Sequence, residues 1–445
     1  MPRIDYNETW VAINWHMDLP TPETHPDFPL WSKGYTPQQV YNLFFPEHFR
    51  FLCNPSRPSV CGRFGLPSDR LWRFEFVVRP GEDPWKMATK EQISKIILPY
   101  LTHEGSRYGV EGSVMYPEDC ITTLRSRPFN FSARSCNKWS IGRVSLVGDA
   151  AHQFPPFGGQ GIASAFRDST ALAWRLAMLY QSPKLHHETI LRAWYTERKQ
   201  QFDTSLAVTV RNGEFVTNGN PFKAFVRDWT LWGMQLVPSW RKQLEKGPRD
   251  QMTRYSHREG MPFLPELNGG LQLPQVYAWD SAEGHVVFTD DLLFPLGKKG
   301  LFQMLILLDH PGEVTSALEA TQGSSHITGN RVLEEEATVL IHDFQADLPA
   351  ETIHSTKARV ARIATDAEFA ADSDLCRNRP PPDGYDAFRL RREVGKDVRF
   401  VVVRPDRFIY AACRTTDELR RSLQRLEGVL QGSTGVAISA RQSRL

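Results

Sequence analysis

The fold is decided by the stretch Arg143-Val-Ser-Leu-Val-Gly-Asp149-Ala-Ala-His152-Gln-Phe-Pro155-Pro156-Phe-Gly158-Gly159-Gln160-Gly161-Ile162-Ala163. It predicts a buried strand over residues 144–147, a rigid Pro-Pro turn, a glycine-rich loop and then a helix. The first turn of a helix has unpaired N–H groups and a positive dipole end, and glycines let a flat or anionic ligand approach the backbone. The stretch therefore predicts an anion site, with Asp149 placed to accept hydrogen bonds from ligand hydroxyls. Spacing alone leaves open the alternative of a plain glycine-rich connection with Asp149 as a turn residue.

The residues on either side of this stretch predict helix after it and sheet before it. From Ile162 to about Asn212, apolar residues recur at intervals of three and four, which is typical of one helix face. Ser182-Pro183 interrupts this pattern because proline lacks an N–H and disfavours helix at the preceding residue. We therefore expect two long helices. Upstream, short apolar runs such as Leu71 to Val78 alternate with Pro and Gly breaks, which predicts a region that is mostly sheet.

The rest of the chain predicts a smaller set of elements. Residues 213–300 mix aromatic residues, prolines and glycines, so we expect short helices and then irregular strands that cover a site. Residues 309–330 lose periodicity and are expected to be a loop. The final part predicts strands over 337–342, 398–403 and 408–412, the last two joined in a hairpin, and an amphipathic helix over 417–430.

Composition describes an ordinary globular chain. Its 445 residues are enough for about three domains, and 41% are hydrophobic and 23% charged. A formal net charge of +2 gives no global field that would attract nucleic acid or an anionic membrane, so neither partner is expected. The N-terminus has no apolar signal-peptide region, and the apolar run at Leu301 to Leu308 is far shorter than the ~20 residues of a membrane helix. We expect a cytoplasmic protein.

The cysteines give no sign of a metal site. They never form a CxxC pair, and none has a nearby histidine at the spacing that metal ligands show. Buried or idle thiols are the favoured interpretation, and no bound metal is expected. The residues concerned are Cys53, Cys61, Cys120, Cys136, Cys376 and Cys413.

A longer pattern around the opening stretch resembles a known family. Gly-Asp-Ala-Ala-His at 148–152, Pro-Pro, Gly-Gln-Gly, Arg167-Asp168 and Leu172-Ala-Trp-Arg-Leu176 resemble the second FAD motif of single-component flavoprotein hydroxylases, such as para-hydroxybenzoate hydroxylase and phenol hydroxylase. The resemblance implies that Asp149 binds ribityl or ribose hydroxyls of FAD and that Pro156 lies beside the reactive edge of the isoalloxazine. It also implies that a helix start presents N–H groups to the pyrimidine side of the flavin, through Gly159, Gln160, Gly161, Ile162 and Ala163.

Catalytic candidates lie on the expected sheet. Arg73 and Glu75 share one strand face by the period of two and could face the substrate over the flavin, together with Pro156 at the flavin itself. A surface ion pair between Arg73 and Glu75 is an equal alternative. His152 is expected to pack under the Pro-Pro turn rather than act as a base. Weaker candidates for lining the same cavity are Tyr116, Arg125 and Arg127.

The flanking regions extend the resemblance to most of the chain. Trp72 to Phe76 resembles the substrate-domain sheet of the aryl-propionate hydroxylases, and Trp194-Tyr-Thr-Glu-Arg198 resembles that branch's Tyr-x-x-Glu-Arg helix. Residues 397–413 resemble the thioredoxin-like tail of phenol hydroxylases, without its CxxC. These likenesses imply an α+β or α/β fold in three parts: a truncated FAD-binding and substrate domain over 1–308, a linker over 309–336, and a thioredoxin-like module over 337–445.

The family's opening motif is missing from this sequence. Members begin with a strand, a G-x-G-x-x-G turn and a helix that hold the ADP part of FAD, and no G-x-G-x-x-G occurs here. The resemblance implies an FAD-dependent monooxygenase that uses NAD(P)H and O2 to hydroxylate a phenolic or related small aromatic molecule, in secondary metabolism or aromatic degradation. A homodimer is one expected assembly. The alternative is a truncated, non-catalytic remnant that depends on a partner chain.

Overall fold

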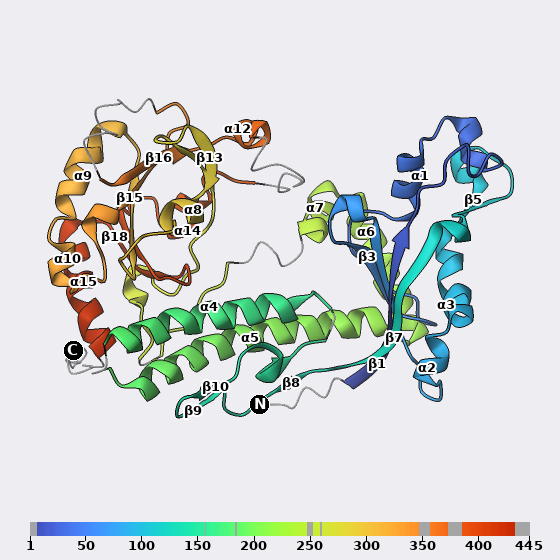
Figure 1. Ribbon diagram of the computed structural model, residues 1–445, viewed down its shortest axis with the longest axis horizontal. Coiled ribbons are helices and arrows are strands. Elements are labelled where there is room, and N and C mark those ends of the chain that lie inside the picture. The colour runs from blue at the N-terminus through green and yellow to red at the C-terminus, as the bar shows by residue number, and fades with distance from the viewer. Residues whose placement is uncertain are drawn as a thin grey trace, which may run out of the picture. The chain divides into compact units, whose positions relative to one another are not determined.

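Two β-sheets organise the chain, one in each of two units of the computed structural model (Figure 1). The structure describes residues 7–155, 157–182, 185–246, 252–258, 260–346, 357–372 and 385–431. Each unit is built from three segments. Unit 1 comprises Met1–Ser135, His152–Gly161 and Ser205–Gly247, and unit 2 comprises Cys136–Ala151, Ile162–Thr204 and Pro248–Leu445.

The sheet of unit 1 has five antiparallel strands in the order β2-β3-β4-β1-β7. In β1, which lies between β4 and β7, Val11, Ile13, Trp15 and Met17 alternate into the core, as the period of two requires. The helices α1 and α3 pack on that face through residues such as Val40 and Ile93. The elements of this layer are β1 (Asn7–Met17), α1 (Pro37–Phe44), β2 (Arg50–Leu52), β3 (Ser59–Phe64), β4 (Leu71–Val77), α2 (Pro84–Met87), α3 (Lys90–Ile97), β5 (Thr102–Glu104), β6 (Ser113–Met115), β7 (Ile121–Ser132), β8 (Arg134–Ser135) and β11 (His152–Gln153).

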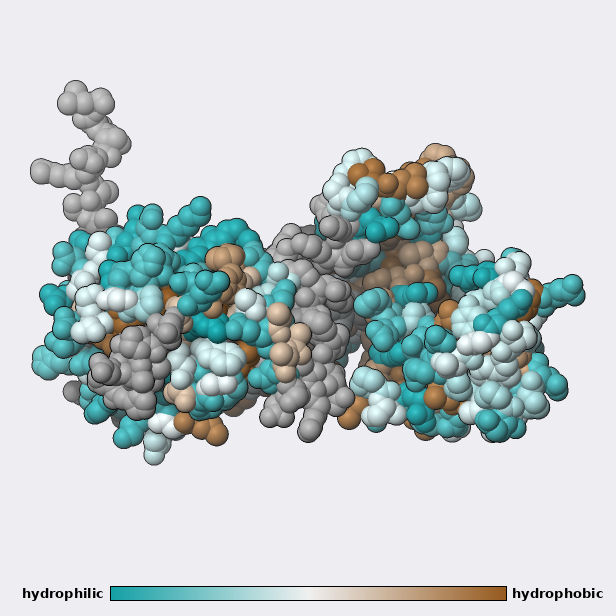
Figure 2. All heavy atoms as spheres, turned by 90° about the horizontal axis from the view of Figure 1, so that it is seen from above, coloured by the Kyte–Doolittle hydropathy of each residue, from teal (hydrophilic) through white to brown (hydrophobic). Residues whose placement is uncertain are grey.

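The helix α6 (Pro221–Leu236) of unit 1 turns its apolar side outward. Asn220 caps it by accepting hydrogen bonds from the N–H groups of Phe222 and Lys223, and the helix buries Ala224 and Arg227. Its exposed residues are apolar over one whole face. These are Phe222, Phe225, Val226, Trp229, Trp232 and Leu236, followed by Trp240 in α7 (Pro238–Lys246). Hydrophobic residues reach the molecular surface as brown areas in Figure 2.

The sheet of unit 2 has seven strands in the order β13-β12-β16-β15-β14-β17-β18. Every residue of β14, β15, β17 and β18 in this sheet is buried. The strands are β12 (Tyr277–Asp280), β13 (His285–Phe288), β14 (Gln303–Leu308), β15 (Thr338–Ile341), β16 (Arg359–Ile363), β17 (Phe400–Val403) and β18 (Ile409–Cys413).

Helices cover both faces of this second sheet, as Figure 1 shows. Met304 and Ile306 point to the side covered by α9 and α15, whereas Leu305 and Leu307 point to the side covered by α8 and α14. A sheet buried on both faces reads as continuous hydrophobic strands, as these do. The helices are α8 (Thr289–Leu293), α9 (Val314–Ala320), α10 (Ser324–Ile327), α12 (Asp366–Ala371), α14 (Arg389–Val394) and α15 (Thr416–Gln431).

The expected linker over 309–336 is wrong. β14 and β15 are parallel neighbours, so the chain between them must cross over, and it does so through α9 and α10. Val314 and Ala317 are buried in the core, which a linker would not allow. The compact unit consequently does not begin at residue 337. The thioredoxin-like character of this region stays a prediction.

Other expectations about the elements are confirmed. The two long helices are α4 (Gln160–Gln181) and α5 (His187–Thr217). The hairpin is β17 and β18, followed by α15 as the amphipathic helix. The chain has the mixed helix and sheet architecture that was expected. Among the described residues, no helix has both the length and the apolar character needed to cross a membrane.

Candidate flavin site

Asp149 follows a short, exposed strand rather than a buried one. β10 (Val144–Ser145) pairs only with β9 (Ser140–Ile141), and the Val144 side chain is 68% exposed. The expected buried strand over 144–147 is therefore wrong. The physical reason is that, among the residues that the structure describes, no further strand pairs with this two-stranded ribbon to cover it. Apolar residues here face solvent although their sequence is typical of a sheet interior.

A sharp backbone turn holds Gly148, the residue before Asp149, against α4 at Ala165 and Asp168. The N–H of Gly148 donates to Asp168 Oδ2 at 3.0 Å, and Gly148 has a φ of +58°. A Cβ at this position would come within 3.0 Å of the Ala165 side chain, so a larger residue would be both strained and crowded. Asp149 itself lies in the 3-10 turn Gly148–Ala150 and is exposed, so its carboxylate can accept hydrogen bonds from a ligand.

The glycine loop that follows has an open backbone. Gly158 and Gly159 have φ values of +112° and +62°, which favour glycine, and α4 begins at the next residue, Gln160. The Gln160 side chain donates to the Gly158 carbonyl at 3.0 Å. A Cβ added at Gly159 or Gly161 would meet no atom within 4 Å. A flat ligand could therefore approach this backbone closely.

The first turn of α4 is exposed and apolar. Ile162 is 75% exposed, Ala163 is half-buried, and Phe166 one turn later is also exposed. Pro156 lies outside the described residues, so its predicted place beside the flavin ring stays a prediction. Residues 148–163, which we call the flavin segment, offer an acceptor carboxylate, helix N–H groups and an apolar surface. Those are the three kinds of contact that a flavin needs.

Arg73 and Glu75 lie on the sheet face opposite the core of unit 1. The register sets Arg73 beside Asn14 and Glu75 beside Ala12. Across β1, the same rows continue to Arg125 and Arg127 of β7. Residues in register across a sheet point to the same side, so four of the predicted side chains share one face. The structure thus brings together Arg73, Glu75, Arg125 and Arg127.

This charged face contains one buried carboxyl. Glu75 is only 7% exposed, and burial raises the pKa of its carboxyl, an effect that the Arg73 guanidinium partly offsets. Arg73 Nε lies 3.9 Å from Glu75 Oε1 and donates to Asn14 Oδ1 at 2.9 Å. The geometry therefore accommodates both predicted roles, the ion pair and the group that faces a ligand.

Two further candidates lie in the protein interior. Tyr116 is fully buried among the rings of Phe44 and Phe45, and its hydroxyl donates to the Asp18 carbonyl at 2.6 Å. Its prediction as a cavity residue is wrong, because this ring belongs to the core on the other side of the sheet. His152 is buried in β11 and packs edge-on against Phe154. Its expected place under the Pro-Pro turn stays a prediction, because Pro156 lies outside the described residues.

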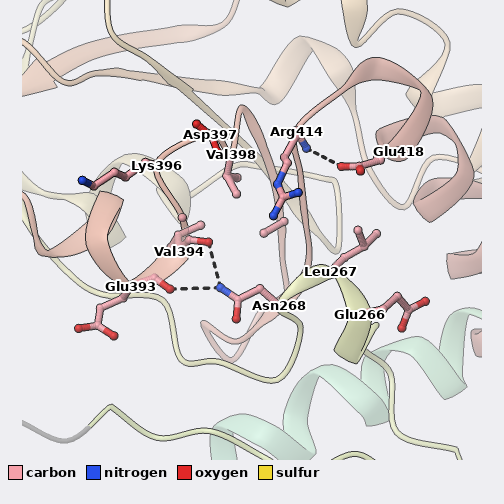
Figure 3. Close-up of a pocket in the computed structure, with 12 residues that line it drawn as sticks. Glu266, Leu267, Asn268, Glu393, Val394, Lys396, Asp397, Val398, Arg414 and Glu418 are labelled. Carbon is pink, nitrogen blue, oxygen red and sulfur yellow. Dashed lines mark hydrogen bonds between the residues drawn. The ribbon is translucent and has the colours of Figure 1, made fainter.

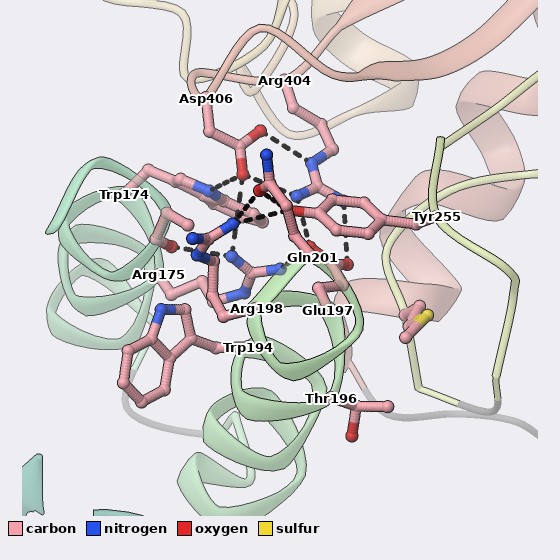
Figure 4. Close-up of polar contacts among 12 residues, drawn as sticks. Trp174, Arg175, Trp194, Thr196, Glu197, Arg198, Gln201, Tyr255, Arg404 and Asp406 are labelled. Atoms are coloured by element: carbon pink, nitrogen blue, oxygen red, sulfur yellow. Dashed lines mark hydrogen bonds and ion pairs between the residues drawn. The ribbon is translucent and has the colours of Figure 1, made fainter. Parts of the chain in front are cut away.

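A buried cluster of charges in unit 2 is a feature that the sequence did not predict (Figure 4). Arg404 makes two-pronged contacts with both Glu197 and Asp406, at 2.6–2.9 Å. Arg175 donates to Glu197 Oε2 at 2.8 Å. Burial disfavours charge on Arg404, but the two carboxylates more than offset this and raise its pKa. We call Arg175, Glu197, Arg404 and Asp406 the charge cluster.

Within unit 2, buried polar contacts hold α4 to α5 and to the β17–β18 turn. Trp174 of α4 donates to Asp406 Oδ2 at 3.0 Å, which ties the helix to the β17–β18 turn. A second buried pair, Arg198 with Asp168 at 2.8 Å, joins α5 to α4, and the same Asp168 accepts from Gly148. In the sequence, these buried contacts are indicated by the Glu-Arg pair of the Tyr-x-x-Glu-Arg-like motif. That motif does not say which residues the pair contacts.

A separate hollow of about 380 Å³ lies in unit 2 (Figure 3). In it, Asn268 Nδ2 donates to the carbonyls of Glu393 and Val394 and so caps the end of α14. None of the residues of the flavin segment lines this hollow, so it is not the flavin site. Its lining comprises Glu266, Leu267, Asn268, Glu393, Val394, Gly395, Lys396, Asp397, Val398, Ala412, Arg414 and Glu418.

Comparison with known proteins agrees with this geometry. Residues 120–203, which contain the flavin segment, match the family described as FAD binding domain. The chain is also similar over part of its length to aromatic hydroxylases. It is 29% identical over 244 residues to 3-(3-hydroxy-phenyl)propionate/3-hydroxycinnamic acid hydroxylase of Burkholderia cenocepacia (strain HI2424), and 28% identical over 191 residues to the protein of that name from Escherichia coli (strain K12 / DH10B).

These matches cover part of each relative. The first covers 55% of this chain and 41% of the Burkholderia protein, and the second covers 43% of this chain and 31% of the Escherichia protein. Aklavinone-11 hydroxylase, solved as a ternary complex with FAD and aklavinone, has a similar fold. Its TM-score is 0.52 at 16% identity, over 95% of this chain and 63% of that one.

Proposed function

We propose that this chain serves an FAD-dependent monooxygenase that hydroxylates a phenolic or related aromatic molecule with NAD(P)H and O2. The observation that carries the proposal is the flavin segment, where an exposed Asp149 and an open glycine backbone flank a helix start. Bound FAD supplies the redox chemistry, and the protein supplies binding, orientation and exclusion of water. We also propose a cytoplasmic location and a homodimer, as expected from the sequence.

The residues of the flavin segment would divide the work of holding FAD. Asp149 would accept hydrogen bonds from ribityl or ribose hydroxyls. Gly159, Gly161 and the N–H groups at the start of α4 would receive the pyrimidine side, where the positive end of the helix stabilises negative charge. Ile162 offers apolar surface in the same turn. Pro156 would flank the flavin ring, as the family resemblance implies.

The charged sheet face would bind and orient the aromatic substrate. Arg73, Arg125 and Arg127 bring positive charge to this face, which favours a phenolate or a carboxylate on the substrate. Burial raises the pKa of Glu75. This carboxyl could therefore exchange a proton with a phenolic hydroxyl at a pH where a free carboxyl is already ionised. Arg73 and Glu75 are thus our catalytic candidates on the sheet.

One observation favours the second candidate, a chain that needs another domain or chain to act. Along α4 in unit 2, Ile162, Phe166, Leu176 and Tyr180 are exposed and fall on one helix face. Apolar stripes of this kind mark surfaces that something else covers. The G-x-G-x-x-G motif for the ADP part of FAD is also absent from this sequence. A partner that carries a dinucleotide-binding domain would account for both.

The test is the effect of Asp149→Ala on FAD affinity. Charge-assisted hydrogen bonds to ligand hydroxyls contribute about 1.5–3 kcal/mol, so the variant should bind FAD about one to two powers of ten more weakly. Asp149→Asn keeps the size of the side chain and should lose less. Titration of each protein with FAD, followed by flavin fluorescence, gives the dissociation constants.

The melting temperature separates binding from folding in this test. Asp149 is exposed, so both variants should unfold at nearly the temperature of the parent chain. If Asp149 is only a turn residue, the melting temperature falls and FAD affinity stays constant. A folded Asp149→Ala chain with unchanged FAD affinity would overturn the assignment of the flavin segment.

A further inference from the structure

Three side chains of metal-ligand type meet in unit 1, at the edge where β1 ends and β7 begins. His25 Nε2 lies 3.1 and 3.2 Å from the two carboxylate oxygens of Asp119, and 3.8 Å from Cys120 Sγ. The ligand atoms of all three residues lie within 4.8 Å of one another. We call His25, Asp119 and Cys120 the His25 cluster. It plays no part in the proposed flavin site.

The backbone on both sides of the His25 cluster is held in place. The N–H of Asp18 donates to the Cys120 carbonyl at 2.8 Å, which joins the two chain segments directly. The His25 N–H donates to the Thr21 carbonyl at 2.8 Å, and Trp31 Nε1 donates to the His25 carbonyl at 2.7 Å. The three side chains therefore converge from fixed positions. Because the ligand residues are already held in position, binding an ion would cost less conformational entropy.

The Thr24 hydroxyl orients the imidazole of His25. Thr24 Oγ lies 2.8 Å from His25 Nδ1, which leaves Nε2 as the ring nitrogen on the side of Asp119 and Cys120. A metal ion would bind Nε2 in the tautomer that carries the ring proton on Nδ1.

Two of the three spacings between the ligand atoms are close to those around a metal ion. Tetrahedral Zn²⁺ with ordinary bond lengths separates nitrogen from oxygen by roughly 3.4 Å and sulfur from nitrogen by roughly 3.6 Å. The observed distances of 3.1 and 3.8 Å lie close to these values. Asp119 is 77% exposed on its side chain, so its carboxylate can adjust to an ion. The Thr24 contact is the outer hydrogen bond that metal-bound histidines commonly have.

We propose that His25, Asp119 and Cys120 bind a divalent transition metal ion, with Zn²⁺ as the best fit to nitrogen, oxygen and sulfur ligands. Binding forms three bonds, to His25 Nε2, to an Asp119 oxygen and to Cys120 Sγ, and it releases the thiol proton to water. Water takes the remaining position of the tetrahedron.

The proposed ion would stabilise the fold by cross-linking two segments of the chain. Burial raises the pKa of the Cys120 thiol to about 11, so without an ion this side chain is a protonated thiol. A bound metal ion replaces that proton. The ion would also join segments 94 and 95 residues apart in the sequence, at the end of the sheet that carries Arg73 and Glu75. This distance along the chain explains why ligand spacing in the sequence gives no sign of the site.

The experiment is metal binding by the reduced chain. Co²⁺ bound to a thiolate has a charge-transfer absorption in the near ultraviolet, and competition between Co²⁺ and Zn²⁺ gives the affinity for Zn²⁺. We expect one ion per chain, and a higher melting temperature when Zn²⁺ is present. Cys120→Ser should abolish the thiolate band, and His25→Ala should weaken binding roughly tenfold or more. Cys136→Ser is the matched control, because Cys136 is an exposed cysteine and lies outside the cluster.

Each outcome decides the proposal. A thiolate band that Cys136→Ser retains and Cys120→Ser loses supports it. Absence of a thiolate band with one equivalent of Co²⁺ on the parent chain overturns it, as does a band that Cys120→Ser retains, and His25 and Asp119 then form a simple ion pair. If Cys120→Ser does not fold, Asp119→Asn serves in its place, and unchanged affinity in that folded variant overturns the proposed ligand set.

Discussion

The two sheets of this protein differ in what covers them. In the seven-stranded sheet of unit 2, the neighbouring strands β14, β17 and β18 are buried and almost wholly apolar. The five-stranded sheet of unit 1 has one apolar face in a core and another that carries Arg73, Glu75, Arg125 and Arg127. These charged side chains lie in register across β4, β1 and β7, whereas β14, β17 and β18 carry none. This difference is why the proposed substrate contacts lie on the unit 1 sheet.

The largest predicted effect concerns the charge cluster beside the covered sheet. Glu197→Gln removes a buried anion that contacts both Arg175 and Arg404. Leaving a buried cation without its partner costs about 3–5 kcal/mol. We expect a loss of this size in the free energy of unfolding, measured by urea titration with circular dichroism.

An exposed ion pair supplies the control for that measurement. Glu91 pairs with Lys95 on the surface of α3. Water and salt screen such a pair, so Glu91→Gln should leave the free energy of unfolding nearly unchanged. Similar losses in the two variants would show that the charge cluster is no more important for stability than a surface pair.

A matched pair of leucines compares the sheets directly. Leu307 of β14 is fully buried, and Leu307→Ala should cost about 2–5 kcal/mol because it leaves a cavity. Leu124 of β7 lies at a register shift and is 57% exposed. Leu124→Ala should change the free energy of unfolding by less than about 0.5 kcal/mol. Equal losses from these two substitutions would contradict the contrast between a covered and a half-covered sheet.

The smallest effect is a pH dependence of stability at Glu75. Below the ordinary pKa of glutamate, both the folded and the unfolded chain hold the proton, and burial of Glu75 carries no ionisation cost. As the pH rises, the unfolded chain ionises first because the folded pKa is raised, so stability falls as the pH rises through the folded pKa. Glu75→Gln removes this dependence.

Urea titrations at about pH 4 and at pH 7 check this prediction. The Glu75→Gln variant should gain stability relative to the parent chain at pH 7, and this gain should shrink toward pH 4. Glu104→Gln, at an exposed position, should show no such trend. A gain that is the same at both pH values would mean that Glu75 is not a buried ionisable group.

The sequence predicted local elements well and long-range partners poorly. α4 and α5 followed from apolar spacing and one Ser-Pro break, because helices depend on residues three and four apart. The predicted loop over 309–330 contains α9 and α10, short helices whose stability comes from packing against a sheet rather than from periodicity. Val144 has the sequence of a buried strand and the surroundings of an exposed one.

The functional residues show the same difference between local and long-range prediction. The flavin segment is continuous, so its residues could be read together, and so could Arg73 and Glu75 on one strand. The charge cluster joins Glu197 to Arg404, which are 207 residues apart, and the His25 cluster joins residues 94 and 95 apart. No spacing rule connects positions so distant, and only the folded chain shows them as neighbours.

Tryptophans on the outward face of α6 can report binding there through their own fluorescence. Trp229 and Trp232 are both exposed there, with ring centroids 5.2 Å apart, whereas Trp10, Trp139 and Trp194 are buried. Indole emission shifts to shorter wavelengths when the ring leaves water, and acrylamide quenches only indoles that it can reach. A molecule that covers this face would therefore shift the emission to shorter wavelengths and protect these indoles from acrylamide. Its binding could be followed without an added label.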